Sequence, residues 1–138
     1  MTNHLDRFVK AQDGIFDNAI EEILAGKKQT HWMWFIFPQL RGLGQSENAH
    51  FYGIRTLNEA RNYLAHPILG PRLKQATQSV IEANVSPQEI FGGIDCQKFA
   101  SCMTLFGEAS PPESVFNQVL RTISITDERT ITMLRREE

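Results

Sequence analysis

The sequence predicts an all-α protein, a compact single-domain bundle of about seven to eight short helices around a central aromatic helix. Three observations support this fold class. Apolar residues recur at helical spacing in most segments, and capping residues separate those segments. The one alternating stretch, residues 122–126, has no evident partner strand. The longest uninterrupted apolar run, residues 32–37, is rich in aromatic residues and is expected to be enclosed by the other helices.

Two helices are predicted ahead of the aromatic one. Asn3 is a candidate N-cap for the first, because its short side chain can accept a hydrogen bond from a free backbone N–H of the first turn. The second runs its apolar stripe from Phe16 to Leu24 with Glu22 on the outer face, and Gly26 is suited to end it. Both helices are expected to pack around the aromatic helix.

The aromatic helix itself is predicted over residues 31–37. Thr30 is its expected N-cap, and Pro38 ends it, because proline lacks an N–H and disfavours helical backbone in the residue before it. Each large aromatic side chain removes ~150 to 250 Å² from water when it is packed, so this helix is the expected centre of the core. Residues 38–46, which include two glycines, are predicted to form a loop.

The later helices are recognised by capping residues at their starts. Phe51 is expected to point inward from the first of them, which spans about residues 47–53. The last helix, from residue 127 to about residue 136, places acidic residues in its first turn and arginines in its last, as the helix dipole favours. The candidate capping residues are Ser46, Thr56, Gly70, Ser86, Asp95, Ser110 and Thr126.

Length and composition fit one globular domain over residues 1–138. With 41% apolar and 22% charged residues, a chain of this size buries about two-thirds of the surface of its unfolded form. The formal net charge of −2 argues against a dedicated nucleic-acid or anionic-membrane binder, because such domains usually carry a basic excess. The N-terminus carries charges where a signal peptide needs apolar residues, so we expect a cytoplasmic protein, a monomer or weak homodimer.

The two cysteines, Cys96 and Cys102, lie on different sides of a predicted helix and are expected to be reduced thiols. Neither belongs to a cysteine and histidine cluster with zinc-ligand spacing. The HExxH, P-loop and GxSxG motifs are missing from the sequence. We therefore predict neither a metal site nor a cofactor.

The strongest candidate site gathers around the aromatic helix and the loop after it. On a helix, His31 would share a face with Trp34, beside the loop that carries Gln39 and Arg41. A helix N-terminus disfavours an imidazolium, which would leave His31 as a neutral base. The structural alternative is that His31 bonds to the backbone while the tryptophans fill the core. Arg41 and the glycines could likewise bind an anion or form only a tight connection.

A second group of candidates lies on the helix predicted to follow Asp95. Lys98 and Ser101 are three residues apart and can share a helix face with Thr104. A serine and lysine pair can be nucleophilic only if the lysine is desolvated and directed at the hydroxyl group. The structural alternative is an exposed pair of Asp95 and Lys98, with the small serine at a helix contact.

Several segments together resemble one known family. They read HWMWFIFPQLRGLGQS at residues 31–46, HPILGPRL at residues 66–73 and SCMTLF at residues 101–106. In these segments, and over nearly the whole chain, the sequence resembles the family catalogued as domain of unknown function 1810 (DUF1810). The resemblance implies a small, mainly α-helical fold and brings no established activity. Where the family commonly reads KxRSSMTLF, this chain has Ala100 and Cys102, while Lys98, Ser101 and Thr104 match.

The leading functional hypothesis is a cytosolic helical domain that binds a small anionic or nucleotide-like ligand between the loop at residues 38–46 and the helix around Lys98. The candidate ligand-binding residues are Trp34, Gln39, Arg41, Lys98, Ser101 and Thr104. One alternative is a hydrolase-type enzyme with His31 as its general base and catalytic residue. The other is a protein interaction module that binds no small ligand.

Overall fold

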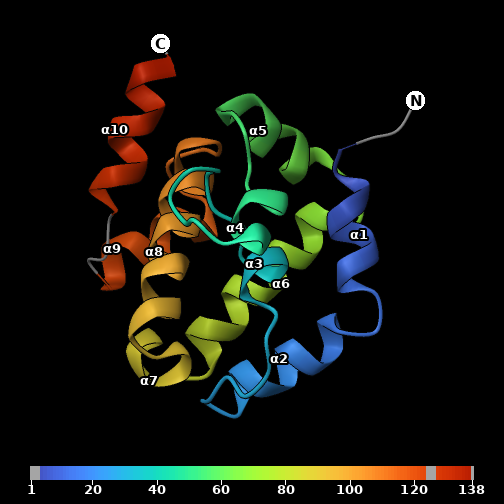
Figure 1. The fold of residues 1–138 in the computed structure, drawn as a ribbon. Coiled ribbons are helices and arrows are strands. Elements are labelled where there is room, and N and C mark those ends of the chain that lie inside the picture. Colours follow the sequence, from blue (N-terminus) through green and yellow to red (C-terminus); the bar gives the residue numbers. More distant parts are fainter. Residues whose placement is uncertain (1–3, 124–126, 138) are drawn as a thin grey trace.

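The computed structural model describes residues 4–123 and 127–137, and in these residues the chain forms ten helices with a single isolated β-bridge (Figure 1). The prediction of an all-α fold is therefore confirmed. Three of the helices, α3, α4 and α7, have only four or five residues. In chain order the helices are α1 (Asp6–Gln12), α2 (Phe16–Leu24), α3 (Met33–Ile36), α4 (Glu47–Phe51), α5 (Leu57–Ala65), α6 (Leu69–Glu82), α7 (Pro87–Phe91), α8 (Gly93–Glu108), α9 (Val115–Ile123) and α10 (Glu128–Glu137).

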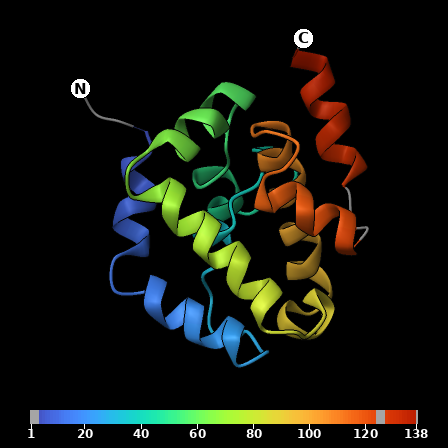
Figure 2. The ribbon, with the colours of Figure 1, turned by 180° about the vertical axis from the view of Figure 1, so that it is seen from behind.

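Two long helices, α6 and α8, organise the others. Helix α8 contacts α3, α5, α7, α9 and α10, while α6 contacts α2, α5 and α9. Figure 1 shows the short helix α3 near the middle of the molecule. Figure 2 shows α6 running diagonally across the opposite face. The aromatic helix is therefore central, as the sequence predicts.

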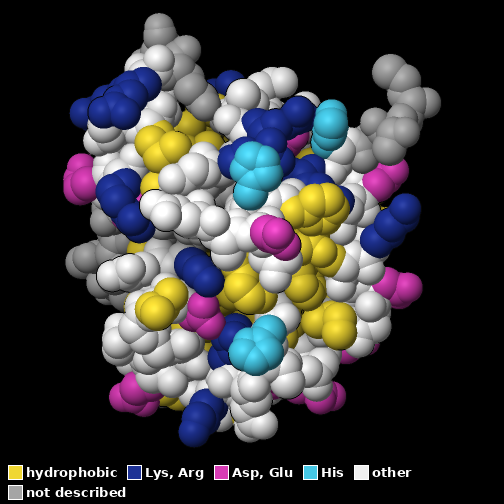
Figure 3. Space-filling model, in the orientation of Figure 1, with side chains coloured by type: hydrophobic (Ala, Val, Ile, Leu, Met, Phe, Trp, Pro, Cys, Tyr) yellow, Lys and Arg dark blue, Asp and Glu magenta, His cyan; other side chains and the backbone are white. Residues whose placement is uncertain are grey.

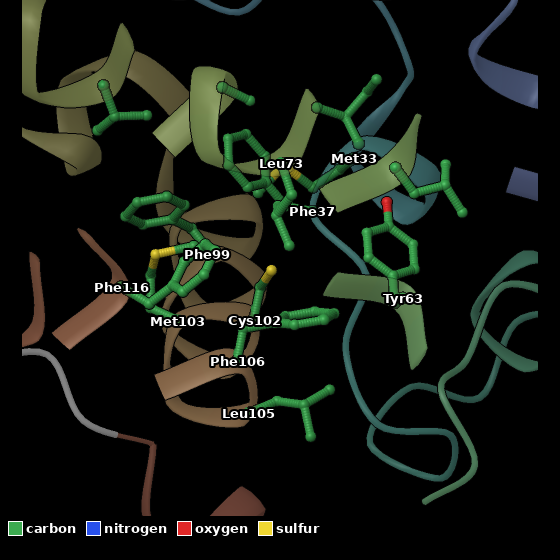
Figure 4. Packing of buried hydrophobic residues seen from close by; sticks show 14 of the residues in the cluster. Met33, Phe37, Tyr63, Leu73, Phe99, Cys102, Met103, Leu105, Phe106 and Phe116 are labelled. Atoms are coloured by element: carbon green, nitrogen blue, oxygen red, sulfur yellow. The ribbon is translucent and has the colours of Figure 1, made fainter. Parts of the chain in front are cut away.

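The core is one cluster of buried apolar side chains to which α8 contributes heavily. Figure 4 shows these side chains close together, with those of α8 between residues from other elements. Phe99 of α8 packs edge to face on Phe37, with ring centroids 5.1 Å apart. Phe106 lies 5.2 Å from Tyr63 and 5.9 Å from Phe116. Aromatic pairs thus join α8 to the end of α3, to α5 and to α9, and each adds about 0.5 to 1.5 kcal/mol beyond area burial.

The aromatic helix is shorter than predicted. It begins at Met33, with Trp32 in the N-cap position and no side-chain cap bond. The prediction of Thr30 as N-cap is wrong, because the backbone N–H and the hydroxyl group of Thr30 both donate to the Glu22 carboxylate. The helix ends at Ile36, ahead of Pro38, as the missing proline N–H requires.

Capping residues mark three of the later helix starts as predicted. The hydroxyl oxygens of Ser46, Thr56 and Ser86 each accept a hydrogen bond from the backbone N–H three residues later. Each of these bonds satisfies one of the free donors of a first helical turn. The short polar side chain at these positions is therefore sufficient to place the helix start.

Other predicted caps are wrong because the helix begins earlier or later than expected. Gly70 lies inside α6, which starts at Leu69, and Asp95 lies in the first turn of α8, which starts at Gly93. Ser110 is replaced as a cap by Ser114, whose hydroxyl oxygen accepts from the backbone N–H of Asn117 at 3.3 Å. The predicted caps Asn3 and Thr126, and most of the alternating stretch at residues 122–126, lie outside the described residues.

Two apolar side chains predicted to point inward are exposed. Leu24 at the end of α2 is 48% exposed, and Phe51 at the end of α4 is 53% exposed. Both belong to the last residue of a short helix, where the final turn extends past the surface it packs against. Helical spacing alone does not detect that edge.

Candidate functional site

Three of the predicted ligand-binding residues, Trp34, Gln39 and Lys98, line one small cavity together with Tyr52. The aromatic helix supplies Trp34, the loop after it supplies Gln39, and α8 supplies Lys98. The cavity has a volume of about 10 Å³, which is at the lower limit for a single water molecule. The cavity therefore has room for a single atom of a ligand, such as a hydrogen-bond acceptor, and not for the whole ligand.

The indole N–H of Trp34 is the unusual feature of this cavity. Its Nε1 atom is buried, and it has no hydrogen-bond acceptor among the described residues. The neighbouring indole differs, because Trp32 Nε1 donates to Glu22 at 3.1 Å. A buried donor without an acceptor costs about 1 to 3 kcal/mol, so the Trp34 N–H is suited to an acceptor from outside the chain.

Lys98 lies directly over the Trp34 ring. Its Nζ atom is 4.7 Å from the ring centroid and 3.5 Å from Oδ1 of Asp95. On the other side of that carboxylate, the Nζ atom of Lys28 lies 2.9 Å from Oδ2 and 5.3 Å from the centroid of the Trp32 ring. Two ammonium groups therefore share one carboxylate, which leaves a net charge of +1 against two indole rings.

Lys28 has no signal in the sequence that would have pointed to this role. It follows α2, where a lysine is suited to the helix dipole and usually remains in solvent. In the structure its side chain is only 9% exposed and pairs with Asp95, which belongs to a helix far along the chain. Only the approach of α8 to the end of α2 brings this ion pair together.

The Glu22 carboxylate fixes the chain segment next to this region by accepting several hydrogen bonds. The carboxylate accepts from the backbone N–H groups of Gln29 and Thr30, the Thr30 hydroxyl, the Trp32 indole and the Asn18 amide. Burial acts to raise the pKa of Glu22, but these hydrogen bonds outweigh it and lower the pKa to about 2. Glu22 thus lies on the outer, partly exposed side of α2, as predicted, and in addition fixes the segment that leads into α3.

Arg41 lies in a neighbouring groove and does not line the cavity. It borders this groove with Gly44, His50 and Phe51, and its Nε atom donates to the His50 carbonyl at 2.8 Å. A Cβ atom on Gly44 would lie 2.7 Å from Ala49 Cβ, so Gly44 packs tightly between groove and cavity. The two hollows are adjacent, and no described residue lines both.

The loop that carries Gln39 and Arg41 is held by backbone hydrogen bonds. Leu40 forms a parallel bridge with Ile54, in which the Ile54 N–H donates to the Gln39 carbonyl at 2.9 Å. The Arg41 N–H donates to the Ile54 carbonyl at 2.8 Å. This pairing fixes the position of the loop beside α4, although the sequence shows no strand pattern there.

The structure places Ser101 and Thr104 away from the cavity. The Ser101 hydroxyl donates to Oδ2 of Asp127 at 3.0 Å, and the Thr104 hydroxyl oxygen accepts from the Asp127 N–H at 2.9 Å. Oδ2 of Asp127 also accepts from the Thr130 N–H at 3.1 Å and so caps α10. Both hydroxyl groups therefore attach α10 to α8, and neither lines the Trp34 cavity.

His31 is exposed and precedes the first residue of α3. No hydrogen bond or ion pair joins its side chain to another residue in the described ranges. It lines neither the cavity nor the groove beside Arg41. The imidazole is accessible, but no group in the described part of the chain orients it.

The face around these two hollows carries both apolar and charged side chains. Figure 3 shows hydrophobic side chains grouped on this face, with lysine or arginine, acidic and histidine side chains around them. Tyr52 links two of the aromatic residues, at 5.4 Å from the ring of Phe35 and 4.8 Å from that of Phe51. Partly exposed rings beside cations suit a flat, negatively charged ligand.

Comparison with known proteins places the chain in a family. The profile of a protein of unknown function, DUF1810, matches residues 2–134. The chain belongs to the DUF1810 family. The segments HWMWFIFPQ and SCMTLF, which carried the resemblance, are thus α3 with its following loop and the buried part of α8.

One solved structure shares both sequence and fold with this DUF1810 protein. It is the crystal structure of the conserved hypothetical protein Rv1873 from Mycobacterium tuberculosis, which is 46% identical, with a TM-score of 0.91. The similarity covers 95% of this chain and 96% of that chain. Among curated proteins none matches the chain. None of the helices in the described ranges combines the length and apolar character needed to cross a membrane.

Proposed function

We propose that this DUF1810 protein is a cytoplasmic domain that binds a small anionic or nucleotide-like ligand on the face of α3 and α4. An anionic oxygen of the ligand accepts from the Trp34 N–H at the mouth of the cavity and pairs with the Lys98 ammonium group. The rest of the ligand lies outside the cavity, against the partly exposed aromatic rings and toward the groove of Arg41.

The buried Trp34 N–H without an acceptor is the observation that carries this proposal. Gln39 lines the same cavity and has a side-chain amide, so three residues with different donor groups border it. An anion receives charge-assisted hydrogen bonds from such donors, which are about twice as strong as neutral ones. The net charge of +1 on Lys28, Asp95 and Lys98 favours the same sign of ligand.

The hydrolase alternative receives no specific support. A general base is usually oriented by a third group, and His31 has no such partner among the described residues. The interaction module would instead use the apolar side chains of the same face. We keep the monomer or weak homodimer as the expected state, without a nucleic-acid or membrane partner.

Calorimetric titration with inorganic phosphate, adenosine monophosphate and uncharged adenosine tests the proposal. We expect saturable binding of the nucleotide and weaker or no binding of adenosine. Lys98→Met keeps most of the side-chain length and removes the charge, and it should weaken nucleotide binding at least tenfold. Trp34→Phe keeps an aromatic ring, removes the N–H, and should weaken binding about fivefold to tenfold.

Lys10→Met is the matched control, because Lys10 is an exposed lysine at the end of α1. It should leave binding unchanged within error. If the wild-type protein binds neither phosphate nor the nucleotide at millimolar concentration, the proposed ligand class is wrong. Equal binding of adenosine and the nucleotide would also contradict the role of Lys98.

A further inference from the structure

A third hollow lies on another part of the surface and shares no lining residue with the Trp34 cavity or the groove beside Arg41. It is a groove between α5, α6 and the connection from α8 to α9, elements that adjoin one another in Figure 2. Its volume is about 750 Å³, within the range of about 300 to 1,000 Å³ that is typical of small-molecule sites.

The floor of this groove is apolar and rigid. Leu64 and Val115, which are partly exposed, contribute to it, and the completely buried Phe116 lies behind them, with its ring centroid 5.9 Å from that of Phe106 in the core. Helices α5 and α6 approach so closely here that a Cβ atom on Gly70 would lie 2.1 Å from the Leu64 carbonyl oxygen. A floor fixed by backbone contact is ready to bind a ligand without first closing.

The rim of the groove carries a net positive charge. Arg61 projects from α5, Lys74 from α6 and Glu113 from the connection before α9. None of these three side chains forms an ion pair with another described residue. The nearby hydroxyl groups of Ser110 and Ser114 are already engaged with each other at 2.8 Å. Two free cations and one carboxylate therefore leave a charge of +1 above an apolar floor.

We propose that this groove binds an amphipathic organic anion, of which an unbranched alkyl monocarboxylate is the simplest form. The alkyl chain covers Leu64 and Val115, and the carboxylate lies at the rim near Arg61 and Lys74. This assignment is independent of the ligand proposed for the Trp34 cavity, because the two sites have no residue in common.

Titration of the whole protein with hexanoate, octanoate and decanoate, below their micellar concentrations, tests the apolar half of the site. Each added methylene should strengthen binding about fourfold, because burying one methylene group contributes about 0.8 kcal/mol. Decylammonium, which has the same chain and the opposite charge, should bind at least tenfold more weakly than decanoate. Equal affinity for decanoate and decylammonium would contradict the proposed role of the positive charge at the rim.

Charge variants test the polar half. Arg61→Gln and Lys74→Gln should each weaken decanoate binding about threefold to tenfold, while Glu113→Gln should strengthen it, because that carboxylate opposes the ligand. Lys10→Gln serves as a matched surface control with no effect. All four positions are exposed, so the variants should retain the wild-type circular dichroism spectrum and melting temperature.

Amide chemical shifts in the same titration locate the site. Decanoate should shift the amides of Ala65 and Ala109, which line the groove, and leave that of Gln39 unchanged. The proposal is overturned if decanoate shows no saturable binding up to a few millimolar, if affinity does not rise with chain length, or if none of the rim variants changes it. Loss of nucleotide binding in Lys98→Met would leave this result unaffected, so the two proposals fail separately.

Discussion

Glu22 shows how a single side chain can position several others. Its two carboxylate oxygens accept from two backbone N–H groups, one hydroxyl, one amide and one indole, all within residues 18–32. The bonds join the end of α2 to the segment that enters α3. They also hold Trp32 in the core and give its indole N–H an acceptor. The nearby Trp34 N–H has no acceptor among the described residues.

Glu22→Gln should lower the free energy of unfolding by about 1 to 2 kcal/mol at neutral pH, after allowance for solvent screening of a partly exposed group. A glutamine of the same length keeps an acceptor oxygen but loses the charge and turns the second oxygen into a donor. Urea denaturation followed by tryptophan fluorescence measures the difference. Glu21→Gln, one residue earlier on the exposed side of α2, is the control and should change stability by less than about 0.5 kcal/mol.

The same variant has an expected pH dependence. The pKa of Glu22 falls from an ordinary value of 4.5 to about 2 in the folded protein. A carboxylate with a lowered folded-state pKa stabilises the fold above its unfolded pKa, and this contribution is lost as the pH falls toward 2. The stability gap between wild type and Glu22→Gln should therefore be full above pH 5 and should narrow between about pH 4.5 and 2. A gap that stays constant over that range would contradict the assigned role.

At the scale of secondary-structure elements, α10 is attached to α8 by one carboxylate. Asp127 caps α10 through the Thr130 N–H, and its Oδ2 atom also accepts from the hydroxyl groups of Thr130 and Ser101. Leu134 is the one buried apolar side chain among the described side chains of α10. The position of this helix therefore depends heavily on the polar contacts of Asp127. The cap and the attachment to α8 are one interaction.

Asp127→Ala should destabilise the protein by about 1 to 2 kcal/mol, the cost of a lost N-cap with its side-chain bonds. Hydrogen exchange is the sharper measurement, because amide protection should fall in α10 while α6 and α8 remain protected. Asp17→Ala removes an exposed first-turn acid from α2 that makes no cap bond, and it should leave exchange unchanged. Equal loss of protection in all helices would show that α10 does not open separately.

The packing of α6 against α5 depends on a single residue, Gly70. It lies inside α6 with ordinary helical backbone, and the Leu64 carbonyl oxygen of α5 occupies the place of a side chain. Gly70→Ala should cost about 2 kcal/mol or more, because backbone and not a flexible side chain must move. Gly93→Ala, in α8 with no atom nearer than 3.8 Å, is the control and should be neutral or slightly stabilising. Differential scanning calorimetry should show a lowered melting temperature for Gly70→Ala and an unchanged or slightly raised one for Gly93→Ala.

At the scale of the whole molecule, the aromatic core determines stability. Phe99 is completely buried and packs on both Phe37 and Phe91, with centroid distances of 5.1 and 5.0 Å. Removing it opens a cavity where the end of α3, α7 and α8 meet. Domains of this size are stable by only about 5 to 15 kcal/mol, so one such cavity affects the entire fold.

Phe99→Ala should lower the free energy of unfolding by about 3 to 5 kcal/mol. Phe51→Ala, at an exposed phenylalanine, should cost less than about 1 kcal/mol. Chemical denaturation followed both by circular dichroism and by tryptophan fluorescence checks the values and the cooperativity. The two probes should give coincident transitions in the wild type, as expected for a single core. A comparable loss in both variants would contradict the central place of Phe99.

Local patterns in the sequence were sufficient for the fold class and for several boundaries. Helical spacing identified most helices, and a short hydroxyl side chain placed the starts at Ser46, Thr56 and Ser86, because a cap bond spans only three residues. The aromatic run at residues 32–37 identified the central helix for a similar reason, since so much apolar surface in one short segment has to be buried.

The candidate site was predictable only in part. Trp34 and Gln39 are close in sequence and share the cavity, and Lys98 joins them from α8, as the sequence predicts. Ser101 and Thr104 appeared equivalent to Lys98 by helical spacing, yet they face Asp127 and α10. A helix has several sides, and the partner that covers each side cannot be read from its own periodicity.

The sequence by itself thus determined the all-α fold class, the central aromatic segment and those helix starts whose caps are local. Only the tertiary structure decided that Lys28 pairs with Asp95, that Glu22 accepts hydrogen bonds, and that the Trp34 N–H has no acceptor among the described residues. The physical reason is range. Caps and stripes depend on residues within one or two turns, whereas burial, ion pairing and unmet hydrogen bonds depend on segments that only folding brings together.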